Sequence, residues 1–249
     1  DARLGIAPKL GSTGDVSIEG AGSTITVIGT RHSSVVVGTV EFDTASSADG
    51  AGMGSLTISD SGLLEVLATQ AHGESEILVG YGGDGILQID TGGSLILDGW
   101  LGVGGNGGTG TVNVLSGGTL LVHDGEGGDD RGIGIEIGLR RGQDANGVGT
   151  MTVSGLGSSV TVLGEEAFIG IGFAHSEDPE SGNAFGQLNV TNGASMTIQA
   201  NHDMGGIIAG VGGGSTAVMN VTGSGSSVSI SGTPAAVLIF ASDIDKGGG

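Results

Sequence analysis

Acidic side chains and arginines gather in one part of the sequence, between residues 123 and 141. The residues of this cluster are His123, Asp124, Asp129, Asp130, Arg131, Glu136, Arg140 and Arg141. Cleavage of an acidic polysaccharide needs carboxylates that hold a cation beside a base, and glycoside hydrolysis needs two carboxylates as acid and base. The cluster is therefore a candidate site for binding or cleaving a polysaccharide. The alternative is that the arginines neutralise neighbouring acids in an inserted loop.

Two acidic segments offer the hard oxygen ligands that Ca²⁺ prefers. They contain Asp124, Glu126, Asp129 and Asp130 in the first segment and Glu177, Asp178 and Glu180 in the second. We expect no required cofactor, and calcium is the ion that these segments would suit. The same residues also fit solvated acidic loops, which is the usual meaning of a run of like charge.

Tyr81 and Trp100 are the candidates for contact with a sugar ring. Each lies near the third strand of one of two adjacent repeat units, which are defined below. An aromatic side chain combines a large apolar face with a polar group, which suits it to such a contact. Ordinary packing in the core or at a corner is the alternative, and it is the commoner use of such rings.

The composition excludes several other classes of chemistry. There is no cysteine, so neither a disulfide nor a thiolate metal site can form. Lys and Arg number 7 against 27 Asp and Glu, and the formal net charge is −20. Such a surface argues against nucleic acid and anionic membrane as partners. No run of 18 apolar residues occurs, so we expect no membrane insertion by this chain.

The elements that would position these side chains come from a repeat. An apolar-x-apolar strand, a polar corner with glycine and a second apolar-x-apolar strand recur seven times, and a less regular third strand follows. In every unit, eight or nine residues separate the leading residues of the first two strands. The leading residues of the first strands are Val16, Leu56, Leu87, Val112, Met151, Leu188 and Met219.

This repeat predicts an all-β parallel β-helix, or β-solenoid, of about seven three-stranded coils. Alternation with period two buries one face of each strand, and a unit of about 34 residues cannot bury that face unless neighbouring units stack on it. Right-handed coiling follows from the general preference of parallel crossovers. The alternative is an antiparallel β-sandwich or barrel, which has no reason to repeat one phrase at one spacing.

We predict a single β-solenoid domain over residues 1–249. Its repeat units lie near 14–51, 52–84, 85–108, 109–146, 147–184, 185–216 and 217–249. Residues 1–13 are interpreted as the end of a preceding coil or a cap, because LGI at 4–6 resembles the third-strand phrase LGV at 101–103. Uncapped ends of a solenoid expose strand edges that can pair further, which favours either additional coils or end-to-end stacking.

Three segments of the repeat resemble the repeats of bacterial autotransporter passenger domains and related secreted adhesins. They read TMTVSGLGSSVTVLG (150–164), TVNVLSGGTLLV (111–122) and AVMNVTGSGSSVSISG (217–232), and the resemblance covers about residues 14–240. It implies a right-handed parallel β-helix, an extracellular or cell-surface location in a bacterium, and a role in adhesion or in building a matrix or surface layer.

From the repeat and the resemblance together, we expect a non-enzymatic structural or adhesive protein. It would be a rigid acidic rod for surface attachment or for self-assembly into filaments or layers. The expected partners are further copies stacked end to end, or a surface glycan or matrix. The alternative is a β-helix that binds or cleaves polysaccharide through the cluster at 123–141.

Overall fold

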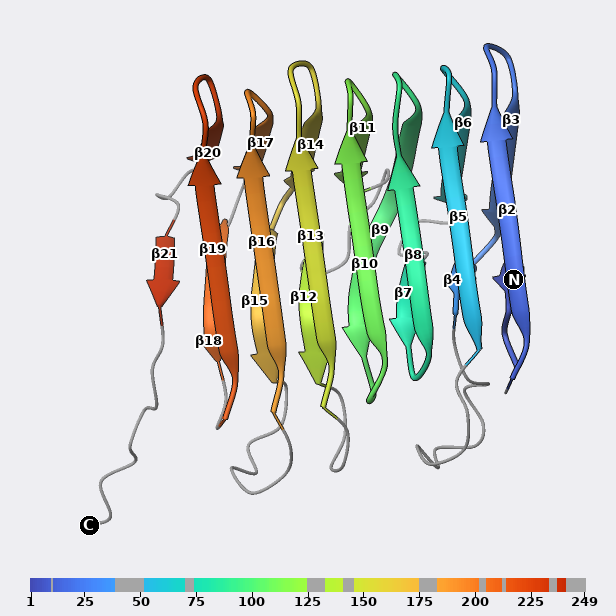
Figure 1. Ribbon diagram of the computed structural model, residues 1–249, viewed down its shortest axis with the longest axis horizontal. Coiled ribbons are helices and arrows are strands. Elements are labelled where there is room, and N and C mark those ends of the chain that lie inside the picture. The colour runs from blue at the N-terminus through green and yellow to red at the C-terminus, as the bar shows by residue number, and fades with distance from the viewer. Residues whose placement is uncertain are drawn as a thin grey trace.

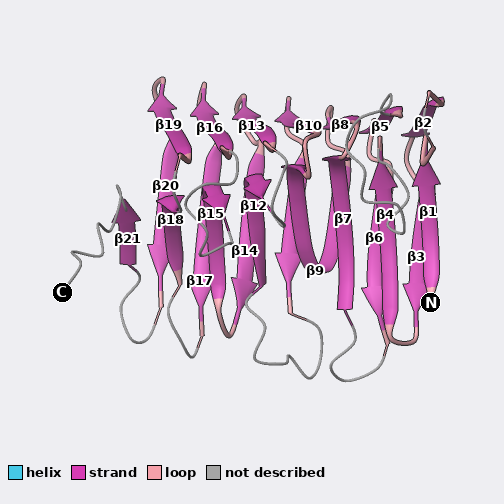
Figure 2. Cartoon of the chain, turned by 90° about the horizontal axis from the view of Figure 1, so that it is seen from below, coloured by secondary structure: helices cyan, strands magenta, loops and turns pink. Residues whose placement is uncertain are grey.

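The alternating apolar pattern builds strands throughout the described chain. The computed structural model describes residues 1–9, 11–38, 52–69, 74–124, 133–140, 146–174, 183–201, 205–211, 214–232 and 237–240. Within these ranges the chain forms strands β1 to β21, all paired in parallel and stacked as successive coils (Figure 1). Figure 2 shows the same stack with strands and loops as its only described elements. The predicted parallel β-helix is confirmed.

Each coil contributes to three sheets, here called A, B and C. Sheet B contains β2 (Thr13–Glu19), β5 (Met53–Ser59), β8 (Asp84–Ile89), β10 (Thr109–Leu115), β13 (Val148–Ser154), β16 (Phe185–Thr191) and β19 (Thr216–Thr222). Sheet C contains β3 (Thr24–Gly29), β6 (Leu63–Ala68), β9 (Ser94–Gly105), β11 (Thr119–His123), β14 (Ser159–Gly164), β17 (Ser195–Ala200) and β20 (Ser227–Ser231). Sheet A contains β1 (Ala2–Ile6), β4 (His32–Val37), β7 (Glu74–Tyr81), β9 again, β12 (Ile133–Arg140), β15 (Ala167–Ala174), β18 (Gly206–Val211) and β21 (Val237–Phe240).

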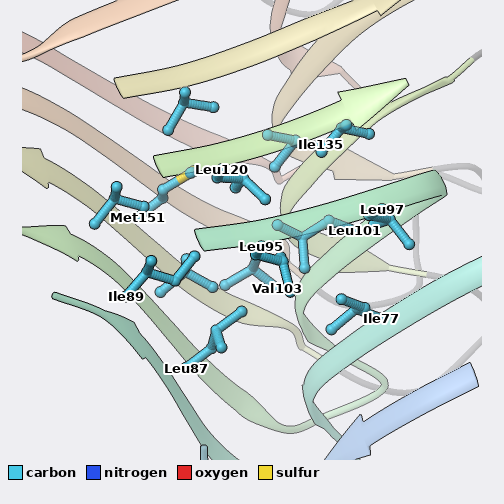
Figure 3. Packing of buried hydrophobic residues seen from close by; sticks show 14 of the residues in the cluster. Ile77, Leu87, Ile89, Leu95, Leu97, Leu101, Val103, Leu120, Ile135 and Met151 are labelled. Atoms are coloured by element: carbon cyan, nitrogen blue, oxygen red, sulfur yellow. The ribbon is translucent and has the colours of Figure 1, made fainter. Parts of the chain in front are cut away.

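One apolar core runs along the inside of the stack. The register places the leading residue of each first strand beside its equivalent in the next coil, as Leu56 lies beside Leu87. These residues are fully buried in the interior coils, and their neighbours in the core come from all three sheets (Figure 3). The period-two alternation therefore points one side chain in two inward, as the repeat predicted.

In the third coil, the structure joins two strands that the sequence pattern separates. The pattern predicts a second strand at Leu95 and a third at Leu101, whereas β9 runs unbroken through both and pairs in sheets C and A. Gly99 lies at the bend with a φ of 146°. A β-carbon there would lie 2.1 Å from the backbone oxygen of Ser75, so only glycine allows this bend.

The corners between sheets B and C are of two kinds, which correspond to the two spacings of nine and eight residues. The longer corner uses two glycines with positive φ, such as Gly20 at 91° and Gly22 at 84°. The shorter corner is a two-residue turn with positive φ at both positions, as at Thr91 (47°) and Gly92 (74°). Both kinds leave the strands on either side in the same place in every coil.

The corner from sheet A to sheet B brings two backbones unusually close. Glycine occupies the same core-facing place of sheet B in six consecutive coils, at Gly14, Gly54, Gly85, Gly110, Gly149 and Gly186. A β-carbon on Gly149 would lie 2.1 Å from the backbone nitrogen of Gly138, which itself has a φ of 69°. This close approach explains some of the 56 glycines in the chain of 249 residues.

The outermost described coils differ from the interior ones in burial. β1 pairs with β4 in sheet A, so LGI at 4–6 occupies the third-strand place that its sequence indicates. At this end, Leu4 and Val16 are only partly buried, although they face the core. At the other end, Met219 is partly buried and Val221 is 43% exposed. The core is thus open at both edges of the described stack.

Candidate functional site

The acidic cluster begins where β11 ends. Asp124 follows β11, and its Oδ2 accepts a hydrogen bond from the backbone N–H of Glu165 in the next coil at 2.7 Å. His123 Nδ1 lies 3.2 Å from the backbone oxygen of Asp124. The register places His123 beside Asp98 of β9, and the Asp98 residue is 8% exposed. These polar groups connect neighbouring coils at one end of sheet C.

Glu136 is the most deeply buried charged residue of the predicted cluster in the described chain. It lies on β12 between core residues Ile135 and Ile137, so its side chain projects to the outer face of sheet A, yet it is 1% exposed. Gly102 and Gly170 are its neighbours on the two adjacent strands. These glycines leave room beside the strand for a side chain to lie close to the sheet.

Most of the other acidic residues and arginines predicted for a site lie outside the described chain. Arg140 is the last residue of β12 and pairs by register with Ala174. The residues that lie outside the described chain are Glu126, Asp129, Asp130, Arg131, Arg141, Glu177, Asp178 and Glu180. In the part of the chain that is described, no group of three or more His, Cys, Asp or Glu residues is placed to hold a metal ion. Calcium binding therefore stays a prediction.

Tyr81 and Trp100 both place their rings over strand β9 on the outer face of sheet A. A β-carbon on Gly102 would lie 2.7 Å from the Trp100 ring, and one on Gly105 would lie 2.6 Å from the Tyr81 ring. Each ring thus fills the space above a glycine, and each residue is partly buried. The structure brings the two rings to one strand, and it gives both of them a packing role.

The outer face of sheet A also holds apolar residues that sequence reasoning missed. Val36, Leu78 and Leu139 are at most 1% exposed and yet do not belong to the core inside the stack. A signal for two of them was present: the third strands read VVV at 35–37 and ILV at 77–79, and a continuous apolar run indicates a strand buried on both faces. Part of the outer face of sheet A, from Val36 on β4 to Glu136 and Leu139 on β12, is therefore buried as well.

Sequence reasoning also missed the outer face of sheet B, which is rich in hydroxyl and amide groups. Four of its strands, β10, β13, β16 and β19, place no charged residue on this face. Their outward residues are Thr109, Thr111, Asn113, Leu115, Val148, Thr150, Thr152, Ser154, Phe185, Gln187, Asn189, Thr191, Thr216, Val218, Asn220 and Thr222. The signal was the outward half of the repeat, because the first strands read TVNV, TMTV, QLNV and VMNV.

Comparisons of this chain with known proteins gave no match. No protein-family model, no curated protein and no solved structure matches this chain. Among the described residues, no helix is long and apolar enough to cross a membrane.

Proposed function

We propose that this protein is a non-enzymatic structural or adhesive component of the bacterial cell surface or its surroundings. It would act as a rigid acidic rod that attaches to surfaces or assembles into filaments or layers. The observation that supports this most is the uniformity of the stack, since sheet B keeps one register through seven strands without interruption.

A continuous stack of this kind resists bending. Neighbouring strands lie roughly 4.8 Å apart, so seven coils give a rod on the order of 30 Å long. Every interior coil buries its apolar residues against the coils on both sides, and no hinge interrupts the core cluster among the described residues. A rod with these properties suits spacing, coating or joining, which need shape more than a reactive group.

Self-assembly would use the open edges of the stack. β21, β19 and β20 form one edge and β1, β2 and β3 form the other, and each of these strands has one described neighbour in its sheet. Partly buried core residues such as Val16 and Met219 lie at these edges. A second copy that continued the parallel register would cover them and pair the edge strands.

The assembly state of the full chain tests the proposal. Static light scattering over a range of concentrations, followed by electron microscopy, should show rods that lengthen in steps of one chain. The measurement is repeated with calcium and with excess chelator, because cations can bridge acidic segments. A monomer at every concentration, indifferent to calcium and without affinity for surface glycans, would overturn both the structural and the adhesive role.

A polysaccharide-binding or polysaccharide-cleaving β-helix is the second candidate. It is favoured by one arrangement, in which Tyr81 and Trp100 lie on the adjacent strands β7 and β9 and each side chain is still partly exposed on the outer face of sheet A. Incubation with acidic and neutral polysaccharides tests cleavage, with replacement of Arg131, Arg140 or Arg141 as the variants expected to lose it. Absence of product from every polysaccharide excludes the enzyme and leaves binding, which a glycan array measures.

A further inference from the structure

The outer face of sheet B is a regular array of side chains. Its seven strands lie side by side, and each contributes up to four outward residues in register with those of its neighbours (Figure 1). One row runs along the middle of the sheet through Ser17, Thr57, Gln88, Asn113, Thr152, Asn189 and Asn220. Because every strand is aligned, the described face presents one continuous surface.

Charge is distributed unevenly over this face. Acidic residues occur on β2, at Asp15 and Glu19, and on β8, at Asp84. The strands β10, β13, β16 and β19 contribute none. In a chain of net charge −20, residues 183–240 contain a single acidic residue, Asp203, and no Lys or Arg. The part of the face formed by β10, β13, β16 and β19 is therefore where a second copy can approach with the least electrostatic repulsion.

Hydrogen bonds within and between coils hold the array in place. Asn220 Nδ2 donates to Asn189 Oδ1 at 2.9 Å, and Gln187 Nε2 donates to the same oxygen at 3.1 Å. Thr191 Oγ1 donates to Ser154 Oγ at 2.9 Å. Side chains that are already ordered lose little conformational entropy when a partner binds. Exposed apolar residues lie among them, including Ile86 at 47% and Val148 at 37% exposure.

We propose that a second copy of this chain packs on the outer face of sheet B, sheet against sheet. Seven strands about 4.8 Å apart and seven residues long, at about 3.3 Å per residue, span roughly 770 Å². A standard stable interface takes about 800 Å² from each partner, so the face has the required size. Stacked sheets pack about 10 Å apart, and hydroxyl, amide and small apolar side chains fill that gap well.

The charge distribution selects one of the two possible face-to-face arrangements. With the coil order reversed, a two-fold axis runs along β10 and places β2 opposite β19, β5 opposite β16 and β8 opposite β13. Asp15 and Asp84 then face strands without charge. With the coil order preserved, the two-fold axis would run along the central row, so β2 would face β2 of the second copy and Asp15 would lie opposite Glu19. The reversed arrangement is therefore the favoured dimer, and it brings Asn113 of β10 opposite its symmetry mate.

A charge swap at Asn113 tests this dimer. Asn113 is partly buried at the centre of the face. In the full chain, Asn113→Glu and Asn113→Lys each place like charges across the axis, so each should raise the dimer dissociation constant at least tenfold. An equal mixture of the two variants should restore a heterodimer. Thr161→Glu is the matched control, because Thr161 is also a partly buried, outward strand residue but belongs to sheet C.

Sedimentation equilibrium gives the masses, and circular dichroism confirms that each variant is folded. A wild-type dimer that Asn113→Glu dissociates, Thr161→Glu leaves intact and the mixture restores would support the inference. A wild type that stays monomeric at millimolar concentration overturns it, as does an equal effect of the Thr161→Glu control. If the wild type forms assemblies larger than a dimer and Asn113→Glu leaves them unchanged, association takes place through the strand edges instead. If the wild type forms no dimer but binds a neutral polysaccharide, and Asn113→Glu loses that binding, the face binds a glycan.

Discussion

The contrast between interior and edge coils makes a quantitative prediction about two equivalent positions. Leu188 is fully buried in β16 and has Met151 and Met219 as its neighbours in register. Met219 occupies the same place in β19, where it is only partly buried and has one described neighbouring strand. Replacing each by alanine removes a side chain of similar size from the same position of the repeat.

The expected costs follow from burial. Truncating Leu188 to alanine loses about 2.4 kcal/mol of transfer free energy at roughly 0.8 kcal/mol per methylene, and the closed cavity raises the total to about 3 kcal/mol. Met219→Ala removes a partly exposed side chain and leaves an open notch that water fills, so about 1 kcal/mol is expected. The interior substitution should therefore destabilise the fold by about 2 kcal/mol more than the edge substitution.

Urea denaturation followed by circular dichroism measures the difference, at concentrations where light scattering finds a monomer. Hydrogen exchange of β16 and β19 accompanies it, because a repeat stack can open from its end before it unfolds as a whole. Equal costs for the two variants would refute the reasoning, since they would mean that the β19 edge is covered in solution. At concentrations where end-to-end stacking occurs, the cost of Met219→Ala should rise toward that of Leu188→Ala.

Three other substitutions test individual features of the fold. Ser158 is 1% exposed, and its Oγ donates a hydrogen bond to a backbone oxygen at 2.7 Å and accepts one from the N–H of Gly117 at 3.0 Å. Ser158→Ala should therefore lower the free energy of unfolding by about 1–3 kcal/mol in urea denaturation. The same change at the less buried Ser226 should cost less. Gly149→Ala should cost about 3 kcal/mol or prevent folding, as thermal unfolding would show, because its β-carbon would overlap the neighbouring corner. Trp100 is the sole tryptophan; if its role is packing alone, Trp100→Ala should lower the melting temperature, and saturating glycan should leave the wild-type Trp100 emission unchanged.

Most of the fold could be predicted from the sequence because burial in a solenoid repeats with the chain. Each coil must place its apolar residues over those of the coil before it, so the spacing of eight or nine residues, as from Val16 to Ile25, predicts the structure directly. The join of two strands in β9 could not be predicted in this way. It depends on the backbone of Gly99 and on its approach to Ser75, which are contacts between coils rather than features of a local pattern.

The candidate site was harder to predict because its residues depend on neighbours that are distant in sequence. Glu136 reads locally as an outward strand residue, and outward residues are usually exposed. It is buried next to Gly102 and Gly170, each 34 residues away, on a face where Leu78 is buried as well. A repeat predicts which side of a strand faces the core, but it does not predict what lies on the other side.

The two proposed contacts between copies use different strands, and their combination predicts a particular assembly. End-to-end stacking pairs β21 with β1, β19 with β2 and β20 with β3, whereas the face-to-face contact uses the outward residues of sheet B. Each copy has one sheet B, and its partner has the reversed coil order, so chains that form both contacts would build a ribbon of two filaments with opposite polarity. The acidic residues elsewhere would oppose further lateral growth. Asn113→Glu should then convert ribbons into single filaments of about half the width in electron micrographs, and ribbons of unchanged width would show that another face joins the filaments.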